Sequence, residues 1–151
     1  MNYIELNNQV IIRDENGKYQ LDKDKEALKS YLEDYIEPRM RKFVIEVIYD
    51  FIRSKNFKFQ SYMSASKFYQ NYALKSDDGE EILESYEDKI LIVSLALANG
   101  DENFAMKIAD KLIKQEFQPA TPTFLNAGRA RAGEMVSCFL ISVEDSCEGI
   151  S

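Results

Sequence analysis

The sequence predicts a mainly α-helical domain with a small β-hairpin, followed by the start of a region with extended structure. Apolar residues recur at helical spacing through most of residues 1–117. Asn16-Gly17 lies between two short apolar runs, which indicates a hairpin. Two prolines after Phe117 interrupt the helical pattern, and a continuous apolar run follows them. We therefore expect an N-terminal helical domain over residues 1–117 and an incomplete second domain over 118–151.

Composition limits the possible functions. The chain has 151 residues, 45% of them hydrophobic, and a net charge of -7. An acidic surface repels phosphate backbones, so no nucleic-acid partner is expected. The sequence contains no histidine, which excludes Ser-His-Asp and Cys-His catalysis and imidazole metal sites, and we expect no bound metal. No long apolar run and no secretory signal are present, so we expect a cytoplasmic protein without a membrane segment.

The first half of the chain predicts short elements separated by clear breaks. Asp22 is a candidate N-cap for the first helix, and Pro38 separates that helix from the next. The expected elements are a hairpin at 10–21, helices at 28–35, 44–52 and 65–74, and a short extended segment at 57–59.

The strongest helix signals follow. Ser85 to Asp88 form a capping-box pattern before a run that is apolar almost all round, which indicates a central, buried helix. Asn99-Gly100 predicts its end, and Asp101 predicts the start of the next helix. The apolar stripe over 104–112 completes a predicted antiparallel helical hairpin.

The pattern changes after Phe117. Two prolines within 118–123 indicate that this stretch is not helical. Arg129 and Arg131 follow in a Gly/Ala-rich loop, where a solvated turn is the common interpretation and a phosphate contact the alternative. Residues 135–141 are predicted to form a buried strand.

Four residues in this last stretch are candidates for chemistry. Cys138 lies in the predicted strand, where a buried core thiol is the commoner interpretation and a reactive thiol the alternative. Thr121 carries a hydroxyl in a proline-rich segment and could serve only as a local cap. Asp145 could be an ordinary turn residue, and Cys147 lies among carboxylates that disfavour a thiolate.

Several blocks in the sequence resemble a known family when taken in order. The run FQPATPTFLNAG over 117–128, followed by GEMVSCFLI over 133–141 and EDS over 144–146, resembles the large, catalytic subunit of class Ib ribonucleotide reductase. Upstream blocks that match the same family are FKFQ at 57–60, KFY at 67–69, YALK at 72–75, YED at 86–88 and ANGD at 98–101. The resemblance implies reduction of ribonucleoside diphosphates to deoxyribonucleotides. It also implies that the second domain is the first piece of a ten-stranded α/β barrel.

The resemblance also implies roles for individual residues. Cys138 matches the N-terminal member of a redox-active cysteine pair, a role that suits a thiol able to deliver electrons and become a disulfide. Ser137, Cys138 and Thr121 match substrate-binding positions, and Asp145 matches the allosteric specificity site for a nucleoside triphosphate effector. The implied partners are a dimetal small subunit that supplies the radical and a thioredoxin- or glutaredoxin-like reductant, with no cofactor bound by this chain itself.

Two departures from the family shape the expected activity. The partner cysteine and the radical cysteine have no counterpart in the chain, and the segment between residues 36 and 57 is shorter than the family pattern. We therefore expect a fragment that is inactive alone. One hypothesis for its role is that a separate chain supplies the remainder and assembles with it. The alternative is a non-catalytic binding module that docks on an intact reductase subunit.

Overall fold

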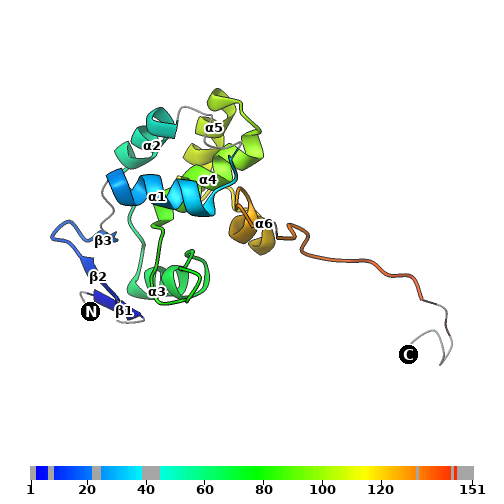
Figure 1. The fold of residues 1–151 in the computed structure, drawn as a ribbon, viewed down its shortest axis with the longest axis horizontal. Helices are drawn as coiled ribbons and strands as arrows, with labels where there is room; N and C mark the ends of the chain where they lie inside the picture. Colours follow the sequence, from blue (N-terminus) through cyan, green and yellow to red (C-terminus); the bar gives the residue numbers. More distant parts are fainter. Residues whose placement is uncertain are drawn as a thin grey trace.

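The computed structural model describes residues 3–6, 9–21, 25–38, 45–131, 133–143 and 145, and shows a helical body beside a small sheet (Figure 1). The predicted features at Asp22, Val44 and Cys147 lie outside the described residues. The elements within the described ranges are β1 (Tyr3–Leu6), β2 (Gln9–Arg13), β3 (Tyr19–Gln20), α1 (Lys25–Tyr35), α2 (Ile45–Ser54), α3 (Tyr62–Asn71), α4 (Tyr86–Ala98), α5 (Glu102–Ile113) and α6 (Thr121–Asn126). None of the described helices is both long and apolar enough to cross a membrane.

The predicted hairpin is confirmed, with one further strand. β2 pairs with β3 in antiparallel fashion, and β1, which the sequence pattern did not indicate, pairs with the other edge of β2. Asp14 orders the turn, because its side chain accepts hydrogen bonds from the backbone N–H groups of Asn16 and Lys18 at 2.9 Å each. Ile4 and Ile11 are partners across β1 and β2, and both are buried, so one face of the sheet covers the core.

Helix α4 lies at the centre of the body, as predicted. Its capping box is formed: the Ser85 N–H donates to Asp88 at 2.7 Å, and the Asp88 N–H donates to the Ser85 hydroxyl at 3.3 Å. Asn99 ends the helix in the left-handed conformation, and Asp101 caps α5. Both α2 and α5 pack on α4, which leaves the residues from Ile90 to Val93 completely buried.

The prediction that residues 118–123 contain no helix is wrong. α6 begins at Thr121, and Pro122 lies in its first turn. Proline is tolerated there because the first N–H groups of a helix have no intrahelical partner. The buried ring of Phe124 then packs on the body, next to the rings of Tyr72 and Tyr86.

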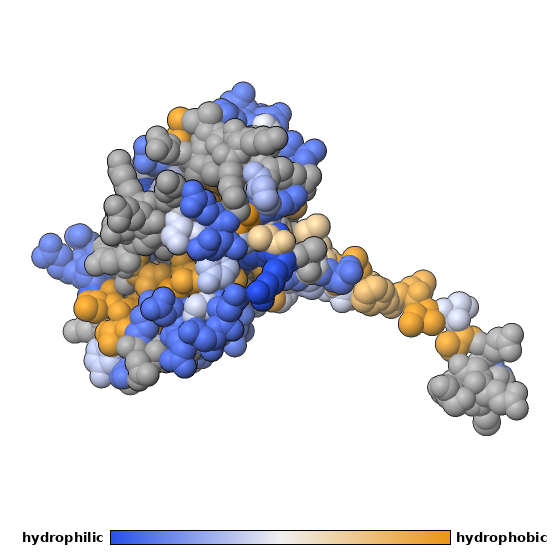
Figure 2. Space-filling model, in the orientation of Figure 1, coloured by the Kyte–Doolittle hydropathy of each residue, from blue (hydrophilic) through white to orange (hydrophobic). Residues whose placement is uncertain are grey.

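The prediction of a buried strand over 135–141 is also wrong. Residues 133–143, called the tail below, are extended but form no strand with any other described residue. Figure 1 shows the tail leaving the body beyond α6, and Figure 2 shows apolar side chains along it. Phe139 is 76% exposed and Leu140 is 101% exposed. An apolar run becomes a buried strand only when neighbouring strands satisfy its backbone groups, and the described chain supplies none beside the tail.

Candidate functional site

The site is built from α6 and the start of the tail. Two side chains of α6 donate hydrogen bonds to consecutive carbonyl groups of the tail. The Thr123 hydroxyl contacts the Met135 carbonyl at 3.2 Å, and the Asn126 amide contacts the Glu134 carbonyl at 2.7 Å. The tail therefore leaves α6 in a defined direction, although its later residues lie away from the body (Figure 1).

The residues assigned by resemblance all lie on α6 or beyond it, and all are exposed. Thr121 is the first residue of α6, and no side chain caps that helix. Ser137 and Cys138 are adjacent on the tail, with 3.8 Å between the Cys138 sulfur and the Ser137 hydroxyl. Asp145 is also exposed, and none of these four residues lines the pocket beside Arg131 or the pocket beside Gly128. The buried-thiol interpretation of Cys138 is wrong, because its side chain faces solvent.

A buried ion-pair network holds α6 against the body. Glu84 is completely buried, and its carboxylate accepts hydrogen bonds from both terminal nitrogens of the Arg129 guanidinium, at 2.9 and 2.6 Å. The Lys89 ammonium lies 2.8 Å from the same carboxylate. Tyr31 donates its hydroxyl at 2.5 Å, and the Leu74 backbone N–H donates at 2.9 Å. One carboxylate thus joins α1, the segment before α4, α4 itself and the loop after α6.

The pKa values in this network follow from burial and charge. Burial by itself would raise the pKa of Glu84, but the positive charges of Lys89 and Arg129 outweigh it and lower that pKa from 4.5 to about 2. Burial raises the pKa of Tyr31 well above its ordinary value. For Lys89 the shift has the opposite direction: burial lowers the pKa of its ammonium group, and the Glu84 carboxylate opposes that shift. Glu84 therefore stays charged at neutral pH and balances two buried cations.

Arg129 is part of this structural network, so the solvated-turn interpretation is wrong for it. Its side chain is 8% exposed, and both terminal nitrogens of its guanidinium donate hydrogen bonds to Glu84. The guanidinium is therefore not available to bind a phosphate. One feature of the sequence does point to this network. Lys89 begins an apolar run that was expected to be buried, and a buried ammonium requires a carboxylate partner.

The backbone around Arg129 is equally constrained. The Ala130 N–H donates to the Tyr35 carbonyl and the Glu37 N–H donates to the Gly128 carbonyl, both at 2.9 Å. Gly128 has φ +76°, and a Cβ atom there would lie 2.5 Å from the Ile92 side chain. Only glycine combines this conformation with such close approach to α4. The loop after α6 is thus tied to both α1 and α4.

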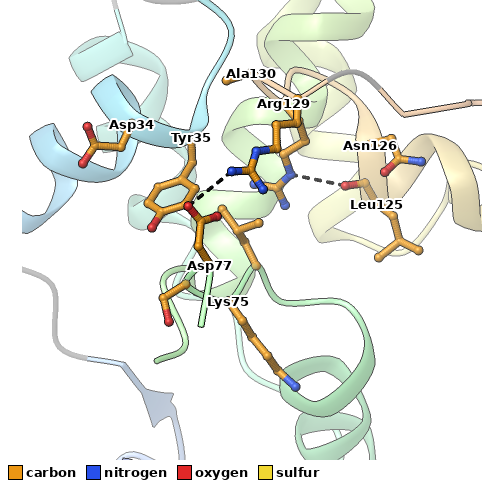
Figure 3. A pocket seen from close by; sticks show the side chains of 11 residues that line it. Asp34, Tyr35, Lys75, Asp77, Leu125, Asn126, Arg129 and Ala130 are labelled. Carbon is orange, nitrogen blue, oxygen red and sulfur yellow. Dashed lines mark hydrogen bonds and ion pairs between the residues drawn. The ribbon is translucent and has the colours of Figure 1, made fainter. Parts of the chain in front are cut away.

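A pocket of about 390 Å³ lies between the end of α1, the 74–77 segment and α6 (Figure 3). Arg131 lies at this pocket and pairs with Asp77 at 3.3 Å, and Asp34 also lines it. Both members of the Arg131 pair are largely exposed, so the pair stabilises the fold little. The lining has mixed charge, and the described residues contain no group of three or more His, Cys, Asp or Glu side chains suited to a metal ion.

Comparison with known proteins places the chain in a family. The family described as ribonucleotide reductase N-terminal matches residues 3–91. This chain belongs to the ribonucleotide reductase N-terminal family. A second match, to the ribonucleotide reductase all-alpha domain, covers residues 58–132 and includes α6 and the Arg129 loop. The observed helical body agrees with that description of the reductase domain.

Relatives of this reductase domain are longer proteins. Ribonucleoside-diphosphate reductase NrdEB subunit alpha of Bacillus subtilis is 46% identical over 177 residues, which cover 99% of this chain and 16% of the relative. Ribonucleoside-diphosphate reductase subunit alpha of the same organism is 44% identical and covers 99% of this chain and 25% of the relative. The subunit alpha of Mycoplasma genitalium is 37% identical, with 98% and 24% covered. The chain therefore spans a quarter or less of the length of these relatives.

Proposed function

We propose that the chain is the N-terminal part of the catalytic subunit of a class Ib ribonucleoside-diphosphate reductase. The observation that carries this proposal is the 46% identity to a reductase alpha subunit across 99% of the chain, including the segment with Cys138. The described structure supports it, because a constrained helical body holds α6 and presents the Cys138 tail to solvent. A thiol that must reach a substrate and a partner thiol has to be accessible.

In the proposed reaction, Cys138 is one of two thiols that reduce the 2′ carbon of a ribonucleoside diphosphate. The two thiols give up two electrons and two protons and become a disulfide. The 2′ hydroxyl leaves as water, and a hydrogen replaces it on the carbon. The second thiol, the radical cysteine and the remaining barrel would come from the part of the subunit that corresponds to the rest of the relatives.

The remaining assigned residues would bind nucleotides. Thr121 and Ser137 offer exposed hydroxyl groups on either side of the contact between α6 and the tail, where they can donate hydrogen bonds to ribose or diphosphate oxygens. Asp145 follows the tail and would contact the nucleoside triphosphate effector. The radical would come from a dimetal small subunit, and a thioredoxin- or glutaredoxin-like protein would reduce the disulfide, in a cytoplasmic reaction.

The test compares two cysteine variants in an assembled enzyme. The chain is combined with a polypeptide that supplies the rest of the subunit, the small subunit and a thiol reductant, and reduction of cytidine diphosphate is measured. Cys138→Ser should abolish turnover, whereas the matched Cys147→Ser should retain it. Full turnover by Cys138→Ser would refute the proposal. The purified chain without the added polypeptide should show no reduction, and turnover there would contradict its assignment as an incomplete unit.

The alternative function is a non-catalytic module that docks on an intact reductase subunit. The exposed apolar tail favours it, since an extended apolar segment can add to the sheet of a partner. In this case the chain would bind an intact subunit and change its activity, with no effect of Cys138→Ser. Titration of the chain into an active reductase, followed by calorimetry and turnover, separates the two functions.

A further inference from the structure

We propose that Thr123 and Asn126 are positioning residues that fix the direction in which the tail presents Cys138. Together with Gly133 they form a unit called the tail anchor below. The link from the tail anchor to catalysis rests on the proposed function of Cys138. The tail anchor itself rests only on contacts within the described chain.

The two donors act on consecutive peptide groups. Thr123 and Asn126 are three residues apart on α6, so their side chains lie on the same face of the helix. They contact the carbonyls of Met135 and Glu134, respectively. Two contacts on adjacent carbonyls restrain both the position and the rotation of the backbone, which a single contact could not do. Cys138 is three residues further, at most about 11 Å along an extended chain.

Gly133 makes the Asn126 contact possible. A Cβ atom at position 133 would lie 2.6 to 2.8 Å from the side-chain atoms of Asn126. The Asn126 amide would have to turn away, and its hydrogen bond to the Glu134 carbonyl would break. Gly133 leaves the space that the Asn126 amide needs, and the amide donates the hydrogen bond to the Glu134 carbonyl.

The tail anchor is joined to the buried core. Phe124, between the two donors in sequence, is buried, and the Arg129 Nε atom donates to the Leu125 carbonyl at 3.2 Å. Arg129 is in turn held by the buried carboxylate of Glu84. The donors thus stand on a helix that cannot shift without disturbing the core, whereas their own contacts with the tail are exposed. Loss of an exposed contact frees the tail and leaves the fold of the body intact.

The experiment measures the spread of the tail in the full chain. Nitroxide labels are placed on Cys138 and on an introduced Asn103→Cys, at an exposed position of α5, in a Cys147→Ser background. Pulsed electron paramagnetic resonance then gives the distance distribution between the two labels. Asn126→Ala, Gly133→Ala and Thr123→Val should broaden the distribution. The ratio of unanchored to anchored tail should rise about fivefold in each, as expected for one lost hydrogen bond of ordinary net strength. Thr123→Ser keeps the hydroxyl group and should keep the narrow distribution of the parent chain.

Matched measurements separate positioning from general destabilisation. Asn71→Ala removes an exposed asparagine at the end of α3, and it should leave the distribution unchanged. The melting temperature should stay the same in all of these variants. The proposal is overturned if Asn126→Ala and Gly133→Ala keep the parent distribution, or if Asn71→Ala broadens it equally.

Turnover in the assembled reductase distinguishes this proposal from the proposed function. Asn126→Ala should lower kcat there by the same factor by which the distance distribution shows the anchored population to fall. If the parent enzyme is inactive while the distances still respond, the proposed function fails and the tail anchor stands. If the parent enzyme is active and Asn126→Ala keeps both kcat and the distribution, the tail anchor fails and the proposed function stands.

Discussion

At the scale of single residues, Glu84 carries the largest consequence. Glu84→Gln would leave the charges of Lys89 and Arg129 buried without a carboxylate. We expect the free energy of unfolding to fall by about 3–5 kcal/mol, the usual result of removing one partner of a buried ion pair. Urea denaturation checks this. The control is Asp77→Asn, which removes an exposed carboxylate paired with Arg131 and should cost less than about 1 kcal/mol.

The same carboxylate makes stability depend on pH in the acid range. Its pKa is lowered to about 2 in the folded protein, below the ordinary value of 4.5. The unfolded chain therefore takes up a proton first, so the stabilisation is complete above about pH 4.5 and is lost as the pH falls toward 2. The loss should be on the order of 3 kcal/mol. Unfolding curves from pH 6 to pH 2 should show this component in the parent protein, and an equal slope in Glu84→Gln would contradict it.

At the scale of elements, the contact between α4 and the loop after α6 depends on the absence of a Cβ atom at Gly128. Gly128→Ala forces a left-handed backbone on alanine and places its Cβ against Ile92. Gly79→Ala is a matched control, because Gly79 has the same φ of +76° but open space around its Cβ position. We expect about 1 kcal/mol of destabilisation for Gly79→Ala and about 2–4 kcal/mol for Gly128→Ala, measured by thermal unfolding. Equal losses would show that crowding against α4 is unimportant.

Local chemistry explains which elements could be predicted from the sequence. The start of α4 at Ser85, its end at Asn99 and the start of α5 at Asp101 depend on neighbouring side chains, so the pattern was sufficient. The prolines predict no helix over α6, but Pro122 lies in the first turn of a helix, where no N–H donor is required. β1 was missed because its pairing depends on β2 and not on its own pattern.

At the scale of the whole molecule, the body and the tail should respond differently to the same kind of substitution. Leu140→Ser replaces a side chain that is 101% exposed, so the melting temperature should stay unchanged and the free energy of unfolding should change by less than about 0.5 kcal/mol. Leu91→Ser replaces a completely buried side chain in α4 and should cost about 3 kcal/mol or more. Calorimetry of both variants tests this, and a large loss from Leu140→Ser would show that the tail packs on the body.

The residues of the candidate site could be predicted from the sequence, but their burial and their partners could not. Family resemblance pointed to Thr121, Ser137, Cys138 and Asp145, and their roles stay predictions. The predicted burial of Cys138 failed because burial of an apolar run depends on strands outside the run. The Arg129–Glu84 pair was not predicted because its members are 45 positions apart and come from different elements. A lysine in an apolar run showed that some carboxylate was needed, but not which one.

The same ion pair has a consequence for the order in which the molecule forms during synthesis. Arg129 meets Tyr31 across 98 positions of sequence, and it belongs to the loop after α6. Until that segment leaves the ribosome, Glu84 has only Lys89 as a cationic partner in this network, and α1 lacks its backbone contacts with Gly128 and Ala130. Long-range contacts of this kind close late and slow folding. The helical body therefore completes its core only after α6 has been made, although most of its helices are encoded well before that point.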